Sequence, residues 1–280
     1  MEKGESNMKN IKRFSILALV LALALGILAS CGGGGGSDED KTITVAASPT
    51  PHAEILNSVK DQLAEEGWTL EVKEFEDYIQ PNVATTEGEV DANYFQHVPY
   101  LEDYNAENGT ELVAVADMHY EKMAVYAGTK TSLDELADGD KIGVPNDTTN
   151  EARALKVLAE NGVITLKEGA GSEATKEDIV DNPKNVEIVE AEAAQLPNSL
   201  PDLAFAVINA NYAIGAGIMD KVVVPEGTDE EQENTYVNVI VVNKGNEDSE
   251  KTKALIAALQ SDATKEFIEK TYNGAVVAKF

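Results

Sequence analysis

Runs of β-branched and apolar residues alternate with helical segments along most of the chain. In residues 51–66, Ile55, Val59 and Leu63 lie four positions apart, which predicts a helix with one apolar face that ends at Gly67. The segments with the composition of strands are 41–47, 70–75, 141–144, 186–189 and 203–208. Two further helical segments, each directly after a strand, are 148–158 and 190–196. This alternation predicts an α/β protein.

Three longer segments indicate how these elements are organised. Residues 203–208 are apolar without interruption, which is typical of a strand buried on both faces of a parallel sheet. Residues 111–127 and 235–242 contain neither glycine nor proline, so each is expected to run unbroken from one lobe to another. Residues 250–272 read as two helices with apolar positions that must pack on a lobe. We therefore expect two lobes joined by two crossovers, with lobe 1 at 41–122 plus 240–280 and lobe 2 at 123–239.

The N-terminus has the pattern of a secretory signal peptide. Residues 8–13 are basic, residues 14–28 carry no charge, and Ala29-Ser30-Cys31 follows. Fifteen apolar residues are fewer than the roughly 20 that span a bilayer, so removal is expected rather than anchoring by protein. Residues 1–30 are therefore predicted to be a signal peptide, with the initiator at Met1 or Met8.

Cys31 is the only cysteine and cannot form an internal disulfide. The sequence from Leu28 to Cys31 resembles a bacterial lipobox, which implies cleavage before Cys31 and its diacylation. Two acyl chains anchor a protein firmly, and residues 31–40, rich in glycine and then acidic, read as a flexible tether. We expect a lipid-anchored protein on the extracytoplasmic face of the cell membrane. A chance cysteine after an ordinary signal peptide is the alternative.

The chain is strongly acidic. Without residues 1–30, which carry four basic and two acidic residues, the formal charge changes from −28 to −30. Nucleic acid is not expected as a partner, because phosphate binding needs basic patches. An anionic ligand must therefore be attracted by local positive charge.

Arg153 is the only arginine beyond residue 30, among seventeen lysines. A guanidinium can bind a carboxylate with two parallel hydrogen bonds, which lysine cannot do. Residues 148–151 fit a capping box, which places Arg153 near a helix N-terminus, where a bound anion would complete the site. The arginine is thus a candidate carboxylate clamp. An ordinary salt bridge is the alternative.

Aromatic and amide side chains gather in three further places. Between positions 78 and 100, five rings occur in a chain that is only 6% aromatic: Tyr78, Tyr94, Phe95, His97 and Tyr100. Such rings form either the wall of a ligand slot or a hydrophobic core. Residues 209–211 place two asparagines directly after an apolar strand, at the sheet edge where α/β proteins bind ligands, although a simple turn fits equally well. Asn238 lies inside an apolar run and needs a polar partner, which could be a backbone group.

Six stretches of the chain closely resemble the methionine-binding lipoproteins of bacterial ABC importers, the MetQ/NlpA family. These stretches are 51–56, 78–82, 91–100, 142–147, 192–197 and 209–213. The similarity spans roughly residues 41–280, and the stretch Asp-Ala-Asn-Tyr-Phe-Gln-His-Val-Pro-Tyr at 91–100 is highly specific. The resemblance implies a type II periplasmic-binding-protein fold that closes on an amino acid between its lobes, and no cofactor.

The resemblance also implies a role for individual residues. Arg153 would bind the ligand carboxylate, and Asn211 and Asn238 would bind the polar groups around its α-carbon. The residues implied to line the pocket for the ligand side chain are Tyr78, Phe95, His97 and Tyr100. The implied partners are L-methionine, with D-methionine or a methionine-containing dipeptide possible in some members, and the permease of an ABC importer. Lys122 departs from the pattern, because many members have proline there, so hinge behaviour does not follow from the resemblance.

Two other function classes fit the sequence less well. An enzyme is disfavoured because the chain has no Gly-x-Ser-x-Gly elbow, no Gly-Lys-Ser/Thr phosphate loop and no Cys–His pair once Cys31 is acylated. A metal-binding importer lipoprotein would need His52, His97 and His119 as ligands, but these do not have close metal-ligand spacing in the sequence. We therefore predict neither catalysis nor a metal site.

Overall fold

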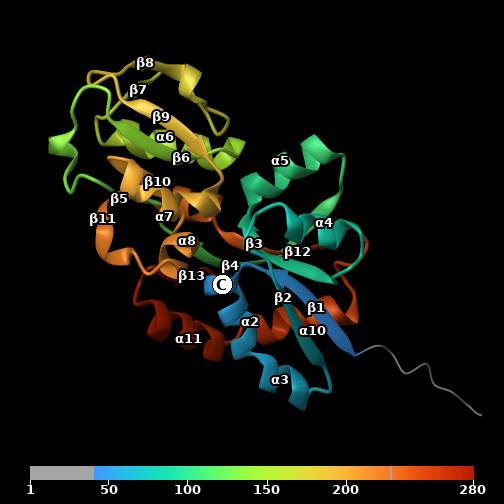
Figure 1. The fold of residues 1–280 in the computed structure, drawn as a ribbon. Helices are drawn as coiled ribbons and strands as arrows, with labels where there is room; N and C mark the ends of the chain where they lie inside the picture. The colour runs from blue at the N-terminus through green and yellow to red at the C-terminus, as the bar shows by residue number, and fades with distance from the viewer. Residues whose placement is uncertain (1–40, 228) are drawn as a thin grey trace, which may run out of the picture. The chain divides into compact units, whose positions relative to one another are not determined.

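The computed structural model describes residues 41–227 and 229–280, which form two mixed β-sheets with helices packed on them (Figure 1). The strands of the first sheet, in spatial order, are β13 (Val276–Ala278), β4 (Leu112–Glu121), β12 (Asn238–Asn243), β3 (Ala92–His97), β1 (Thr42–Ala47) and β2 (Thr69–Glu74). Those of the second sheet are β11 (Val222–Pro225), β5 (Ala124–Ala127), β10 (Phe205–Ile208), β6 (Lys141–Pro145) and β9 (Glu187–Ala191). A separate pair consists of β7 (Thr165–Leu166) and β8 (Ile179–Asp181). The α/β class predicted from the sequence is confirmed.

Helices connect the strands in both parts of the chain. The segments that carry the first sheet contain α2 (Glu54–Ser58), α3 (Lys60–Glu65), α4 (Gln80–Thr86), α5 (Val98–Asn108), α10 (Glu250–Leu259) and α11 (Asp262–Tyr272). The segments that carry the second contain α6 (Thr148–Glu160), α7 (Leu196–Ser199), α8 (Ala210–Gly215) and α9 (Glu230–Thr235). Among the described helices, none combines the length and the apolar character that crossing a bilayer requires. The predicted signal peptide, Cys31 and the tether lie outside the described residues.

Each sheet has its own hydrophobic core. In the first, Val45 of β1 and Ile55 of α2 pack with Leu259 of α10 and Ile268 of α11, and all four are fully buried. As a result, α10 lies close to β1 although the two come from opposite ends of the described chain (Figure 1). Burial of one such side chain stabilises the fold by about 1.5–3 kcal/mol. The two predicted C-terminal helices are therefore confirmed and complete the core of the N-terminal strands.

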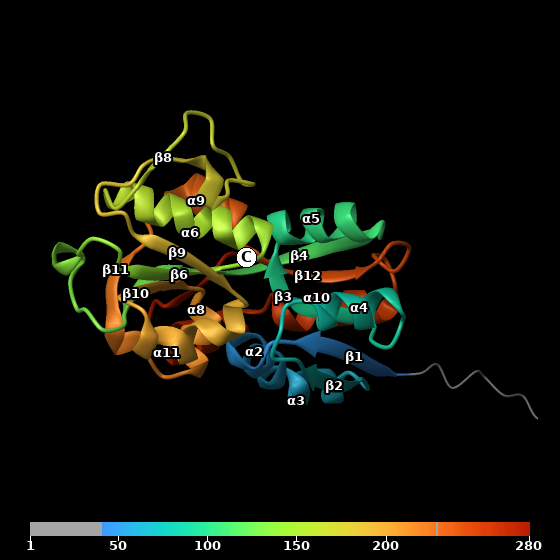
Figure 2. The same ribbon diagram turned by 45° about the horizontal axis from the view of Figure 1, so that its top comes forward.

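The chain passes between the sheets twice (Figure 2). β4 ends at Glu121 in the first sheet and β5 begins at Ala124 in the second, so the segment 111–127 is not one unbroken strand. On the return, α9 ends at Thr235 and β12 begins at Asn238. Both predictions of continuity are wrong: residues 122–123 lie between two strands of different sheets, and residues 236–237 lie between a helix and a strand.

Two other elements differ from prediction. The helix expected at 51–66 breaks between α2 and α3, where the Ser58 hydroxyl donates a hydrogen bond to the Ile55 carbonyl at 2.6 Å and Val59 leaves helical geometry with ψ 3°. β10 is buried along its length as expected, but it runs parallel only to β6 and antiparallel to β5. The sheet is mixed because β5 enters it directly from the first crossover.

Candidate functional site

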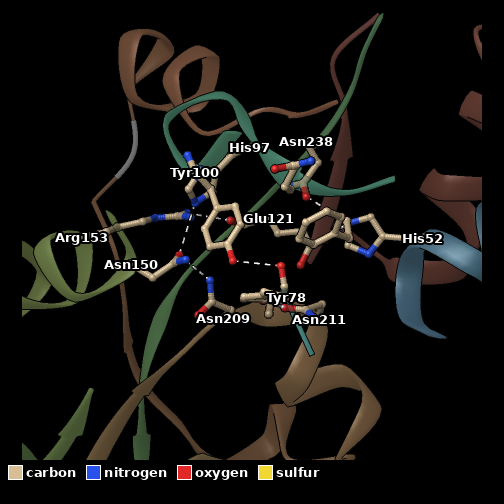
Figure 3. Close-up of a pocket in the computed structure, with 13 residues that line it drawn as sticks. His52, Tyr78, His97, Tyr100, Glu121, Asn150, Arg153, Asn209, Asn211 and Asn238 are labelled. Carbon is tan, nitrogen blue, oxygen red and sulfur yellow. Dashed lines mark hydrogen bonds and ion pairs between the residues drawn. The ribbon is translucent and has the colours of Figure 1, made fainter. Parts of the chain in front are cut away.

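One pocket brings together all seven residues that were predicted to bind a ligand: Tyr78, Phe95, His97, Tyr100, Arg153, Asn211 and Asn238 (Figure 3). The volume between the walls of this pocket is ≈ 370 Å³ when the solvent at its opening is included. The room left free among its side chains is ≈ 20 Å³, which holds about one water molecule, so a ligand must displace side chains to enter. Six lining residues were not predicted as ligand contacts: His52, Gln96, Glu121, Asn150, Asn209 and Ala210.

The pocket lies where several strands end. β3 ends at His97, β6 leads through Asp147 into α6, and β10 is followed at once by Asn209. In α/β sheets this edge, beyond the carboxyl ends of the strands, is the usual place for ligands. Phe95 and His97 are two positions apart in β3, so both side chains point to the same face. Motifs that lie far apart in the sequence therefore meet in one site, because the strands that precede them end close together.

One wall of the pocket is aromatic. The ring centroids of Tyr78, Phe95 and Tyr100 lie 5.8–5.9 Å from one another, in tilted and edge-to-face arrangements. The Tyr100 hydroxyl donates to the Tyr78 carbonyl at 2.9 Å, which fixes the two rings together. Of the two readings of the ring cluster, the structure thus favours a slot that opens on the pocket, while Tyr94 points elsewhere and is fully buried.

Side chains from the two sheets meet across the pocket. The Tyr78 hydroxyl donates to Asn211 Oδ1 at 2.6 Å, and the Tyr212 hydroxyl donates to the Glu76 carbonyl at 3.0 Å. The rings of Tyr78 and Tyr212 are 4.9 Å apart. The pocket is therefore enclosed by direct contact between the two lobes.

The N-terminus of α6 is capped differently from the prediction. Asp147, one residue earlier than expected, is the cap, and its carboxylate accepts from the Asn150 backbone amide at 3.0 Å and from Asn150 Nδ2 at 2.8 Å. Glu151 instead accepts from the Lys176 backbone amide at 3.0 Å. The predicted capping box is thus wrong, and Arg153 lies in the second turn of α6, too far along for strong interaction with the helix terminus.

Arg153 makes a buried ion pair. Its Nε donates to Glu226 Oε2 at 2.9 Å, and its Nη2 donates both to Glu226 Oε1 and, at 2.8 Å, to the Glu121 carbonyl. The Tyr236 ring stacks against the guanidinium at 4.3 Å. Among the described residues, the hydrogen bonds of the guanidinium use Nε and Nη2, and Arg153 lines the pocket. Arg153 therefore forms neither an ordinary surface salt bridge nor a site that is free for a ligand alone. Its partner Glu226 is 73 positions away, and the sequence gave no indication of this pairing.

The two charges of this pair stabilise each other. Burial alone would raise the pKa of Glu226, but the Arg153 charge and its hydrogen bonds outweigh burial and lower that pKa. Burial likewise opposes the charged form of Arg153, and Glu226 outweighs it, so the arginine pKa rises above its ordinary value. Glu226 also accepts from the Tyr120 hydroxyl at 2.6 Å and the Met123 amide at 2.7 Å. The pair therefore ties α6 to the first crossover.

His97 and Asn150 form a second fixed polar group. His97 Nδ1 accepts from the Tyr100 backbone amide at 3.2 Å, so Nε2 carries the proton and donates to Asn150 Oδ1 at 3.3 Å. Burial, and then the nearby Arg153 charge, lowers the His97 pKa to about 3, and the ring is neutral. Asn209 Nδ2 also donates to Asn150 Oδ1, at 2.8 Å, whereas its own buried Oδ1 has no partner among the described residues. An unpartnered buried acceptor in a pocket wall points to a ligand donor.

Two histidines and a carboxylate cluster beside the pocket. His119 Nε2 donates to Glu121 Oε1 at 2.6 Å, and His119 Nδ1 accepts from the Tyr94 hydroxyl. His52 Nε2 lies 3.5 Å from Glu121 Oε1 and 3.0 Å from Asn238 Oδ1. Burial lowers the pKa of His52 to about 4 and that of His119 to about 3, while burial raises the pKa of Glu121. Both histidines are therefore neutral beside a buried carboxyl group.

The types of side chain in this cluster could also hold a metal ion. One ligand atom each from His52, His119 and Glu121 lies within 4.8 Å of the others. The fold thus brings together two histidines that lie far apart in the sequence, although the linear spacing gave no metal motif. Zinc sites use such ligands, but both ring nitrogens of His119 already take part in hydrogen bonds. The cluster forms a hydrogen-bonded network in which one ring nitrogen, His52 Nδ1, is buried without a partner among the described residues.

Known proteins resemble the chain over most of its length. The family model for NlpA lipoproteins matches residues 43–280. The D-methionine-binding lipoprotein MetQ of Escherichia coli is 44% identical over 216 residues, which cover 75% of this chain and 78% of that protein.

Two solved structures share the fold. A nutrient-binding protein from Burkholderia cenocepacia, bound to methionine, has a TM-score of 0.80 at 40% identity and covers 85% of this chain and 100% of its own. The substrate-binding protein of a methionine transporter from Streptococcus pneumoniae has a TM-score of 0.81 at 35% identity, with coverage of 86% and 96%. The fold is the predicted two-lobed type II periplasmic-binding-protein fold with two crossovers. The chain belongs to the NlpA lipoprotein family.

Proposed function

We propose that this protein captures methionine between its two lobes and delivers it to an ABC importer. The observation that carries the proposal is the composition of one enclosed pocket, with an aromatic slot on one side and a fixed guanidinium and amides on the other. A relative is named for D-methionine and a solved neighbour holds methionine. The chemistry of the pocket and the names of its relatives therefore agree.

The pocket suits each part of the ligand. A thioether is apolar and polarisable and gains about 0.3–1.5 kcal/mol from contact with an aromatic ring, which the slot of Tyr78, Phe95 and Tyr100 offers. At the polar end, Nη1 of Arg153 can bind the carboxylate. The amides of Asn211 and Asn238 line the space between these two ends. L-methionine and D-methionine share all of these groups, and both are ligands under the proposal.

Methionine is expected to raise the melting temperature of ligand-stripped protein, because a ligand that binds only the folded state stabilises it by mass action. At a hundredfold excess over the dissociation constant, the gain in unfolding free energy should be about 2.7 kcal/mol. Thermal melts with a panel of amino acids, dipeptides, sugars and metal ions measure this effect. Leucine is the control of similar size without sulfur, and it should shift the melt less.

The contrary result is equally clear. If no amino acid moves the melting curve while a metal ion or a sugar does, the methionine assignment fails. Mass spectrometry of the ligand retained through native purification provides an independent identification.

We further propose that the mature protein is anchored through two acyl chains on Cys31, with residues 32–40 as a tether that lets the lobes reach the permease. Membership of a lipoprotein family and the lipobox-like sequence support this. The formal charge of the mature chain makes adsorption to anionic lipid unfavourable, so attachment depends on the lipid.

Cys31→Ser is expected to abolish acylation and to leave methionine binding unchanged, since the thiol is the attachment point of the lipid and the pocket is formed by other residues. Metabolic labelling with a radioactive fatty acid measures the first effect and calorimetric titration the second. Equal label in the wild-type and Cys31→Ser proteins would contradict the anchor. Membrane retention alone would not decide it, because an uncleaved signal peptide can also hold the variant there.

A further inference from the structure

Three buried amide side chains connect α4 to β3: Asn82 of the helix, and Asn93 and Gln96 of the strand (Figure 1). Each is at most 3% exposed, and β3 is buried along its whole length. Amides in such a strand need polar partners. Neither asparagine lines the pocket, so a contact with the ligand does not account for them.

The three amides bond to one another. Asn82 Oδ1 accepts from Gln96 Nε2 at 2.6 Å and from Asn93 Nδ2 at 3.0 Å, and Asn82 Nδ2 donates to Gln96 Oε1 at 3.0 Å. Gln96 Nε2 also donates to Asn93 Oδ1 at 2.8 Å. The Thr85 hydroxyl, one turn further along α4, accepts from Asn93 Nδ2 at 2.7 Å. Every amide oxygen and nitrogen of this network is therefore used.

The network depends on a bulge in β3. Asn93 and Gln96 are three positions apart, and in a regular strand such side chains point to opposite faces. Two consecutive residues of β12, however, pair with Tyr94 and Gln96, so Phe95 is an extra residue in β3. The bulge allows Gln96 to reach Asn93 while Phe95 lines the pocket. The bond between the two amides thus holds the bulge that presents the Phe95 ring.

The position of α4 also determines where the other two rings of the wall lie. The Asp77 carboxylate accepts from two backbone amides at the start of α4, at 2.7 and 2.8 Å, so Tyr78 is in the tight turn that leads into this helix. The Tyr100 hydroxyl in turn donates to the Tyr78 carbonyl. The hydrophobic cluster that includes α4 is small, with Ala46, Ala84 and Val90 as its buried members. Directional hydrogen bonds therefore fix α4 more than apolar packing does.

We infer that the network of Asn82, Asn93 and Gln96 is the positioning group for the aromatic wall, and that it determines how strongly the protein prefers a ligand with a long thioether side chain. This inference rests on the proposed function and adds residues that act through Tyr78 and Phe95 rather than by contact. A wall that is held in shape before the ligand enters loses less side-chain freedom on binding, and affinity rises accordingly.

The test compares methionine with α-aminobutyrate, which keeps the amino and carboxylate groups but lacks the sulfur and has a shorter side chain. Asn82→Ala removes three bonds of the network and is expected to lower the preference for methionine about tenfold, which corresponds to about 1.4 kcal/mol. Competitive calorimetric titration of ligand-stripped protein measures the two dissociation constants. Leu63→Ala, at a fully buried position of α3, is the control: it lowers stability and should leave the preference within roughly twofold of wild type.

A milder pair of variants keeps the test decisive if Asn82→Ala does not fold. Thr85→Val removes the hydroxyl that accepts from Asn93 at nearly constant volume, whereas Thr85→Ser keeps the hydroxyl and loses a methyl group. Thr85→Val is expected to lower the preference for methionine and Thr85→Ser to preserve it. If only packing mattered, Thr85→Ser would have the larger effect.

Two results would overturn the inference and leave the proposed function standing. One is a set of folded Asn82→Ala and Thr85→Val proteins that melt at lower temperature but keep the wild-type preference, because the network would then only stabilise its lobe. The other is a Thr85→Ser protein that loses as much preference as Thr85→Val. A wild-type protein that binds neither ligand is a different outcome, since the proposed function then fails and the inference fails with it.

Discussion

Glu226→Gln is expected to lower the free energy of unfolding by about 3–5 kcal/mol, the usual effect of removing one partner from a buried ion pair. Arg153 is 4% exposed and its pair with Glu226 uses Nε and Nη2 together, so water cannot easily replace the lost carboxylate. Glutamine keeps the shape and can still accept from the Met123 amide. The loss therefore reports the missing charge and the hydrogen bonds that Glu226 Oε2 accepts from Arg153 and Gln232, rather than a cavity.

Urea denaturation followed by circular dichroism measures this effect. The control is Glu266→Gln, because the pair of Glu266 with Lys270 is exposed and should contribute no more than about 1 kcal/mol. A Glu226→Gln protein as stable as this control would mean that the Arg153–Glu226 pair does not stabilise the fold.

The same pair has a predictable pH dependence. Since the folded-state pKa of Glu226 lies below its unfolded value of about 4.3, the stabilisation is present above that pH. It disappears as the pH falls through the folded-state pKa, where the wild-type carboxylate becomes protonated. The difference in stability between wild type and Glu226→Gln should therefore be constant near neutral pH and shrink below about pH 4.

The sequence predicted which segments build the site but not how they pair. The aromatic stretch at 91–100 and the asparagines at 209–211 were found because unusual residue types cluster locally, and topology alone was needed to bring them together. Arg153 was found because it is unique. Glu226 was missed because it is one of 50 acidic residues, and only the fold shows which carboxylate is buried against the guanidinium.

The histidines also show that the sequence does not predict which distant residues pack together. His52 and His119 lie in different stretches, and their ring centroids are 4.9 Å apart only because β4 runs close to the turn before α2. Linear spacing can exclude a local metal motif, but it gives no information about groups assembled from distant segments. Glu121 was overlooked for a related reason: it stands inside a strand-like run, where its neighbours gave no sign that it faces a pocket.

The predicted strand boundaries were wrong where the chain passes between the two lobes. The run 111–127 has strand composition throughout, yet Lys122 and Met123 form the passage between the sheets. At this point the backbone is held from both sides, because Arg153 Nη2 binds the Glu121 carbonyl and Glu226 accepts from the Met123 amide. Lys122 is thus flanked by two hydrogen bonds that hold the crossover.

Arg153→Ala is expected to weaken methionine binding by about 2–5 kcal/mol, since a desolvated carboxylate loses its charged partner. Arg153→Lys keeps the charge but cannot donate to Glu226, Glu121 and a ligand from three fixed nitrogens, so a smaller loss is expected. Calorimetric titration with methionine measures both. Every 1.4 kcal/mol corresponds to a tenfold change in the dissociation constant, so the effect of the alanine variant should exceed tenfold.

Arg153→Ala also leaves Glu226 buried without its cation, and Arg153→Lys loses part of the hydrogen bonding of the pair, so a loss of binding could follow from a loss of folding. The double variant Arg153→Met, Glu226→Gln separates the two effects. It removes both charges, keeps the hydrogen bond to the Met123 amide, and should recover much of the stability, because uncharged replacements of a buried ion pair are often tolerated. Binding should stay weak, because no guanidinium faces the pocket. A folded double variant that binds methionine within roughly threefold of wild type would show that the arginine serves only the ion pair and that the ligand carboxylate lies elsewhere.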